Sequence, residues 1–142
     1  MTVFLLDVNL LLALSDPMHV HHETAHHWFA SVGRAAWATC PITENGFVRI
    51  ASHPRYPNRP GDAPAVLDIL RRFCADAGHQ FWSDNVSLRD VVLPGASFTH
   101  TPITDMYLLA LAVAYSGKLA TFDQRIPTGI VRDGAAALEL IT

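Results

Sequence analysis

Residues 101–112 have the sequence TPITDMYLLALA, and residues 119–123 have the sequence LATFD. The first stretch predicts a helix that is buried on most sides, because Pro102 prevents an earlier start and the residues after Asp105 are almost all apolar or small. The second stretch predicts a buried strand that ends at Asp123. Ligands bind at the carboxyl ends of the strands in parallel α/β sheets. Both aspartates are therefore predicted to face one ligand-binding edge of a sheet.

The overall composition indicates one globular domain that spans residues 1–142. Half of the residues are hydrophobic and 16% are charged, which excludes an intrinsically disordered chain. The formal net charge is −3, so the protein as a whole has no electrostatic attraction to nucleic acid. Any such binding would need a local patch of positive charge or bound cations.

The two cysteines, Cys40 and Cys74, lack the spacing of a metal site and are too few for a disulfide scaffold. We expect free thiols and a reducing compartment. The apolar N-terminal stretch has no preceding basic residue and no small-residue cleavage site, and no span reaches transmembrane length. The sequence therefore predicts a cytoplasmic protein with no membrane association.

Short apolar strands alternate with helical patterns along the chain, which predicts an α/β fold with a mainly parallel central sheet. The layers are expected to form an α/β/α sandwich. The predicted strands are residues 3–6, 36–40, 80–82, 119–122 and 138–141, the last at an edge. The predicted helices are residues 10–14, 20–32, 65–77 and 87–92, one that begins near Glu44, and one that Thr104 caps.

Four acidic residues follow strands or open helices at the same predicted edge, namely Asp7, Glu44, Asp105 and Asp123. Four carboxylates there would repel each other unless a cation lay between them. The fitting ion is Mg²⁺ or Mn²⁺, which prefers oxygen ligands and can activate water in phosphodiester hydrolysis. Glu44 and Asp105 taken singly are also typical helix caps. Asp7 and Asp123, directly after buried strands, are harder to explain by structure alone.

Four segments occur in the order and spacing of the PIN domain: residues 5–9 (LLDVN), 43–49 (TENGFVR), 104–110 (TDMYLLA) and 120–123 (ATFD). The chain most resembles the VapC toxins of bacterial toxin–antitoxin pairs, from residue 3 to about residue 141. The resemblance implies a three-layer PIN-like fold and a Mg²⁺- or Mn²⁺-dependent endoribonuclease that cuts tRNA or ribosomal RNA and inhibits translation. It also implies a VapB-type antitoxin as partner and a homodimer.

The resemblance assigns roles to individual residues. Catalytic roles fall on Asp7, Glu44, Asp105 and Asp123, and the metal is expected on the three aspartates, with Glu44 as a further ligand or water-orienting group. The supporting positions match Asn9, Thr104, Thr121 and Arg49. A hydroxyl or amide at such positions can orient a ligand or its water.

A proline-rich loop at residues 53–64 carries Arg55, Tyr56 and Arg59, which could bind RNA phosphates and stack on a base. An ordinary solvated loop explains them equally well. Histidines crowd residues 19–27, where His22 and His26 are one helical turn apart. A zinc or nickel site there lacks a third ligand, so packing and hydrogen bonding are favoured, with His22 the best candidate to approach the acidic edge.

Two rival functions remain open at this point. Phosphoryl transfer through an aspartyl phosphate on Asp7 usually requires a second aspartate two residues on, where Asn9 stands. A non-catalytic module that binds RNA or a partner typically lacks one or more of the acids. Asp84 could join the acidic edge, although a turn-forming aspartate before Asn85 is the simpler interpretation.

Overall fold

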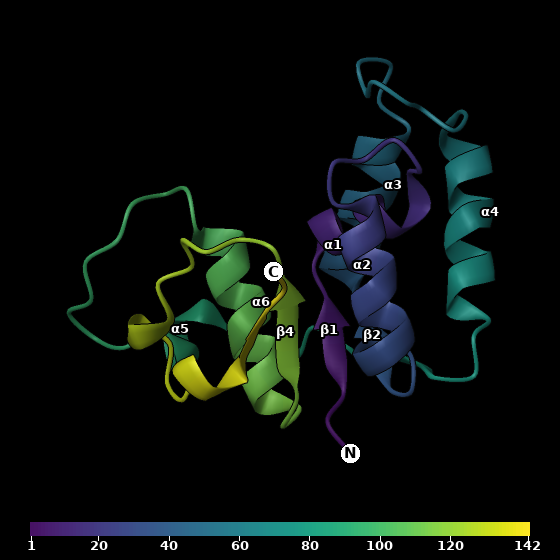
Figure 1. Ribbon diagram of the computed structural model, residues 1–142. Coiled ribbons are helices and arrows are strands. Elements are labelled where there is room, and N and C mark those ends of the chain that lie inside the picture. The colour runs from purple at the N-terminus through teal and green to yellow at the C-terminus, as the bar shows by residue number, and fades with distance from the viewer.

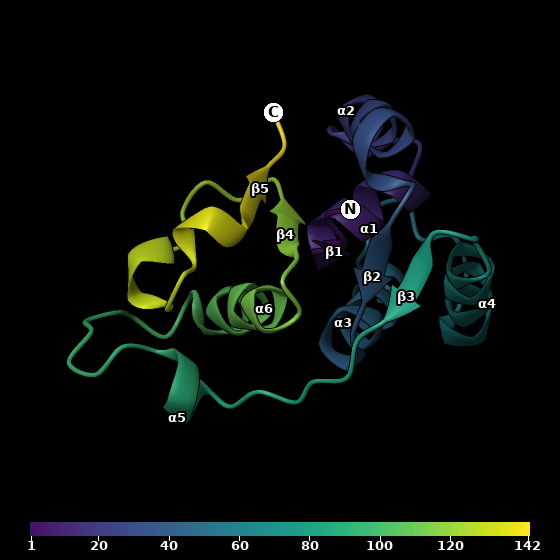
Figure 2. The same cartoon turned by 90° about the horizontal axis from the view of Figure 1, so that it is seen from below.

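The computed structural model describes all residues from Met1 to Thr142. A five-stranded sheet in the order β3-β2-β1-β4-β5 forms its centre, and every neighbouring pair is parallel (Figures 1 and 2). The strands are β1 (Phe4–Leu6), β2 (Trp37–Thr39), β3 (His79–Phe81), β4 (Lys118–Thr121) and β5 (Leu138–Leu140). All five predicted strands are present, and β5 is an edge strand as predicted.

Six α-helices connect these strands. They are α1 (Val8–Ser15), α2 (His22–Trp28), α3 (Pro41–Ala51), α4 (Ala63–Cys74), α5 (Leu88–Val91) and α6 (Ile103–Ala114). A π-helical turn continues α2 over Phe29–Gly33, and short 3₁₀ turns cover Thr128–Ile130 and Ala135–Ala137. None of these helices combines the length and apolar character that crossing a membrane requires.

The sheet has one core on each face because side chains alternate along its strands. Phe4 and Leu6 of β1 pack with α1, α2, α3 and α4, whereas Leu5 between them packs with α6. In β2, Trp37 lies in the same core as Phe4, and Ala38 lies in the same core as Leu5. The predicted three-layer α/β/α sandwich with a parallel sheet is therefore confirmed.

Two helix starts differ from the prediction. α3 begins at Pro41 rather than near Glu44, because proline fits the first turn and the Thr43 hydroxyl accepts from the Cys40 N–H at 3.0 Å. Pro102, not Thr104, is the N-cap of α6, and no side chain caps this helix end. Thr104 therefore lies inside the first turn of α6, where its hydroxyl is exposed.

The packed pair α3 and α4 extends beyond the carboxyl edge of the sheet, with the connecting loop at its tip (Figure 1). α6 lies on the other side of the sheet, so α3 and α6 face each other across the ends of β1 and β4 (Figures 1 and 2). Gly46 allows α3 to approach α1 closely, since a Cβ there would lie 2.8 Å from Val8 Cγ2. This arrangement leaves a cleft above β1.

Candidate active site

Asp7 lies at the bottom of this cleft, directly after β1, where it is the N-cap of α1. Its side chain is only 5% exposed. Oδ1 accepts a hydrogen bond from the Val8 N–H at 2.8 Å, and Oδ2 accepts one from the Thr121 hydroxyl at 2.7 Å. The start of α1 and the end of β4 thus hold the two carboxylate oxygens in place.

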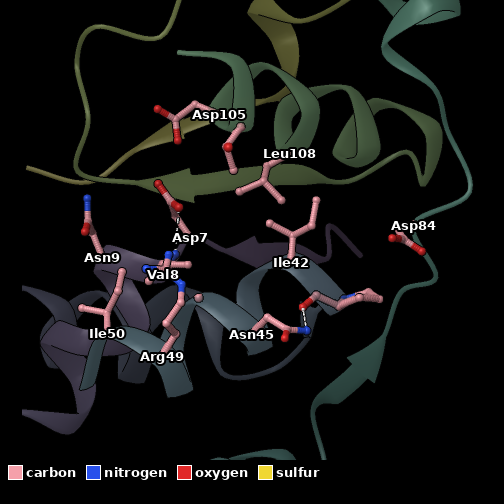
Figure 3. A pocket seen from close by; sticks show the side chains of 13 residues that line it. Asp7, Val8, Asn9, Ile42, Asn45, Arg49, Ile50, Asp84, Asp105 and Leu108 are labelled. Atoms are coloured by element: carbon pink, nitrogen blue, oxygen red, sulfur yellow. Dashed lines mark hydrogen bonds between the residues drawn. The ribbon is translucent and has the colours of Figure 1, made fainter. Parts of the chain in front are cut away.

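Asp105 faces Asp7 from the first turn of α6, on the opposite wall of the cleft (Figure 3). The cleft has a volume of about 570 Å³. We call it the acidic cleft, and its lining residues are Asp7, Val8, Asn9, Pro41, Ile42, Asn45, Gly46, Arg49, Ile50, Asp84, Thr104, Asp105 and Leu108.

Asp123 is tied to the same centre through Thr121. Its backbone N–H donates to the Thr121 hydroxyl oxygen at 3.0 Å, while the Thr121 proton goes to Asp7. Asp123 lines an adjoining side hollow of about 630 Å³ that shares Asn9 with the acidic cleft. One fully buried threonine therefore connects two of the three aspartates.

Burial and neighbouring carboxylates raise the pKa of Asp7 and of Asp105. Burial and, to a smaller extent, the charge of Asp123 raise the pKa of Asp7, although hydrogen bonds from Thr121 and Val8 oppose the shift. Burial and then the charges of Asp7 and Asp123 raise the pKa of Asp105 to about 6. A cation between the three would relieve this repulsion, and the donors are all oxygens, so the residues present fit Mg²⁺ or Mn²⁺.

Glu44, predicted to lie with the three aspartates, lines neither the acidic cleft nor the side hollow. Glu44 is on a different face of α3 from Asn45 and Arg49, which line the cleft, because successive helical residues point about 100° apart. Its Oε2 accepts a hydrogen bond from Thr39 at 2.7 Å, away from Asp7. The sequence places Glu44 near the correct edge of the sheet, but the early start of α3 decides its direction.

The predicted supporting residues reach the centre from different elements. Asn9, Thr104 and Arg49 line the acidic cleft from α1, α6 and α3 respectively, and Thr121 holds Asp7 from beneath. Asp84 also lines the cleft, at its far end in Figure 3, so of its two interpretations the structure favours the one in which it joins the acidic edge.

The predicted RNA-binding loop does not line the cleft or the side hollow. The Tyr56 hydroxyl donates to Asp16 at 2.8 Å and its ring packs on the core, so this ring is not free to stack on a base. Arg55 and Arg59 are exposed at the tip of the α3–α4 pair, and Nε of Arg59 donates to the Gly61 carbonyl at 2.8 Å. Of the three predicted loop residues, only Arg55 and Arg59 remain candidates for RNA contact.

The histidines of residues 19–27 divide into two groups. His22 and His26 lie 2.7 and 2.8 Å from the Ala13 and Leu14 carbonyls, so they satisfy the open end of α1 as packing predicted. His22 is therefore not the histidine near the acidic edge. His19 and His21 instead line the side hollow, where the His21 ring stacks on Phe122 at 4.5 Å.

Sequence reasoning also missed Arg125. Its backbone N–H donates to Asp123 Oδ1 at 2.8 Å, its Nε lies 3.4 Å from the same oxygen, and it lines the side hollow. The signal was present, because an aspartate that follows a strand often accepts the N–H two residues on. Arg125 is a cation next to the carboxylates, where a phosphate could approach.

Curated relatives cover nearly the whole chain. It is 47% identical over 140 residues to Ribonuclease VapC44 of Mycobacterium tuberculosis, covering 97% of both chains. It is 40% identical over 141 residues to Ribonuclease VapC38 of the same species, again covering 97% of both. Identity to Ribonuclease VapC39 is 44% over 127 residues, covering 84% of this chain and 87% of the relative.

Among solved structures, the chain resembles the crystal structure of VapBC2 from Rickettsia felis bound to a DNA fragment from their promoter. The TM-score is 0.55 at 13% identity, and the match covers 99% of this chain and 100% of the other. At this identity the likeness concerns the fold. No family model matches the chain.

Proposed function

The chain belongs to the VapC ribonuclease family, and from this premise we propose that its acidic cleft is the active site of a Mg²⁺- or Mn²⁺-dependent endoribonuclease. The observation that carries the proposal is the convergence of Asp7, Asp105 and Asp123 on one centre, where burial and the neighbouring carboxylates raise the pKa of Asp7 and of Asp105. Asp7, Asp105 and Asp123 would hold the metal ion. When bound, the ion supplies a Lewis acid that activates water and neutralises charge in phosphodiester hydrolysis.

The side chains around the cleft have separate tasks in this proposal. Thr121 holds Asp7 in one orientation, so its carboxylate needs no rearrangement to bind an ion. The Asn9 amide lies where cleft and side hollow meet and can orient a water or a phosphate oxygen. The Arg49 and Arg125 guanidinium groups supply positive charge to an otherwise negative protein, for contacts with the RNA backbone.

We extend the proposal to substrate and partner. The resemblance implies tRNA or ribosomal RNA as substrate, and the names of the relatives favour a ribonuclease over a non-catalytic binding module. The similar solved structure is a VapBC complex, which supports a VapB-type antitoxin as partner. A basic antitoxin side chain that enters the acidic cleft would compete with the metal ion and inhibit the enzyme. A homodimer and a cytoplasmic location remain predictions.

The test is RNA cleavage by the purified, antitoxin-free protein. We expect discrete fragments from total bacterial RNA with Mg²⁺ or Mn²⁺, none with EDTA, and none from Asp7→Asn. Asp62→Asn is the matched control, because this exposed aspartate caps α4 away from the cleft and asparagine caps equally well. Intact RNA under all conditions, together with no Mn²⁺ binding by calorimetry, would overturn the proposal.

A further inference from the structure

A second polar cluster lies on the face of α3 that turns away from the acidic cleft. We call it the Cys–His cluster, and it consists of Thr39, Glu44, Cys74 and His79. One ligand atom from each of Glu44, Cys74 and His79 lies within 4.8 Å of the other two, and all three residues are half-buried. The proposed ribonuclease makes no use of any of them.

The buried Thr39 hydroxyl connects the members of this cluster. It donates to Glu44 Oε2 at 2.7 Å, lies 2.7 Å from His79 Nε2, and lies 4.0 Å from Cys74 Sγ. Its single proton goes to Glu44, so in the contact with His79 the Nε2–H donates to the Thr39 oxygen. A metal ligand that is fixed by a hydrogen-bonding neighbour in this way needs little reorganisation to bind.

The fold brings the cluster together from four elements. Thr39 ends β2, Glu44 is in the first turn of α3, Cys74 ends α4, and His79 opens β3, at one end of the sheet in Figure 2. The tight turn between α4 and β3 depends on Gly78, because a Cβ there would lie 2.1 Å from the Arg34 carbonyl oxygen.

Trp37 fixes the orientation of the histidine. Its ring packs against the His79 imidazole at a centroid distance of 4.7 Å, and its own Nε1 donates to Asp76 at 3.0 Å. The imidazole is thus held from its face while Nε2 points toward Thr39 and Glu44. This packing distinguishes His79 from the exposed His27.

The donor atoms select a different metal from the acidic cleft. Thiolate and imidazole ligands suit Zn²⁺ or Co²⁺ rather than Mg²⁺, which prefers oxygen. Zinc bonds of about 2.0–2.3 Å in a tetrahedron place ligand atoms about 3.3–3.8 Å apart. The Cys–His cluster needs to contract by only about 1 Å from its widest separation to reach this geometry.

We propose that Glu44, Cys74 and His79 form a Zn²⁺-binding site, with a water as fourth ligand and the adjacent Thr39 hydroxyl positioning Glu44. On binding, the Cys74 thiol loses its proton to the solvent as the bond from sulfur to zinc forms, and the His79 proton moves from Nε2 to Nδ1 through solvent, which frees the Nε2 lone pair for the ion. The ion would link the start of α3, the end of α4 and the start of edge strand β3. Since the other face of α3 lines the acidic cleft, this link would also stiffen one wall of the active site.

The experiment is a Zn²⁺ titration of the metal-stripped, full-length protein in excess Mg²⁺, with Co²⁺ as spectroscopic probe. We expect one equivalent of Zn²⁺, a higher melting temperature, and a Co²⁺ spectrum with a thiolate charge-transfer band. Cys74→Ser and His79→Gln should each weaken binding more than about 10-fold and Cys74→Ser should remove the band. Glu44→Gln is a second, milder variant that leaves the packing of the cluster intact.

Two controls separate this site from others. Asp7→Asn removes a carboxylate from the acidic cleft and should leave Zn²⁺ binding unchanged, so failure of the proposed nuclease would not affect the result. His27→Asn tests the exposed histidines and should also have no effect. Absence of saturable Zn²⁺ binding, binding that survives both Cys74→Ser and His79→Gln, or binding lost in either control would overturn the proposal. Melting in EDTA verifies that each variant is folded.

Discussion

Two fully buried threonines end the strands on either side of β1, and each donates to a carboxylate at 2.7 Å. Thr121 of β4 donates to Asp7, and Thr39 of β2 donates to Glu44. The surroundings then differ, because Thr121 joins two aspartates that face a cleft, whereas Thr39 joins a glutamate to a histidine and a cysteine. A threonine at a strand end thus supports a centre with oxygen donors alone in one place. In the other it supports a cluster with oxygen, nitrogen and sulfur donors.

The largest expected effect is a difference in RNA cleavage between variants of Asp123 and of Glu44. We expect Asp123→Asn to lower RNA cleavage by more than about 10²-fold, because even groups behind a metal ligand typically contribute 10–100-fold. Glu44→Gln should change cleavage by less than about 3-fold, since Glu44 lines neither the acidic cleft nor the side hollow. Rates at saturating Mn²⁺ are the measurement. A Glu44→Gln rate as low as that of Asp123→Asn would place Glu44 in the catalytic centre and break the comparison.

An intermediate effect is expected from the threonines themselves. Thr121→Val keeps the shape of the side chain but removes the hydrogen bond to Asp7, which should lower cleavage about 10–100-fold and weaken Mn²⁺ binding. Thr39→Val should leave cleavage nearly unchanged and destabilise the fold by about 1–3 kcal/mol, because buried partners lose a hydrogen bond. Equal losses of cleavage in both variants would contradict the distinction between the two threonines.

The sequence predicted the positions of the strands more accurately than the directions in which the side chains after them point. Asp7 and Asp123 follow buried apolar strands, and the chain has little freedom there, so their positions at the carboxyl edge could be predicted. Glu44 depends on where α3 begins. A start three residues earlier than predicted, at Pro41, turns its side chain toward Thr39.

Contacts between distant segments could not be predicted from local patterns. Tyr56 has the composition of an RNA-stacking residue in an exposed loop, yet its hydroxyl is held by Asp16, 40 residues earlier in the chain. The Cys–His cluster likewise joins residues 39, 44, 74 and 79, whose spacing resembles no metal motif. The first feature depends on the packing of α1 against α3 and the second on the packing of α3 against α4, which periodicity alone does not specify.

The smallest expected effect concerns the stability of the metal-free protein. The folded pKa of Asp105 is about 6, above the unfolded value of about 3.9, because burial and the neighbouring aspartates disfavour the charged form. The contribution of this group to stability is therefore fully present below about pH 4 and is lost as the pH rises through about 6. Asp105→Asn removes the charge and should stabilise the metal-free protein at neutral pH.

We expect a gain of about 1–2 kcal/mol at pH 7 for Asp105→Asn, less than the full two-unit shift implies, because the half-exposed carboxyl is screened by solvent. Denaturant unfolding in EDTA at pH 4 and pH 7 measures it, and the gain should shrink toward zero at pH 4. Saturating Mn²⁺ should reverse the sign at pH 7, because the ion stabilises only the protein that binds it. A gain of equal size at both pH values would show that the repulsion among the three aspartates is not its cause.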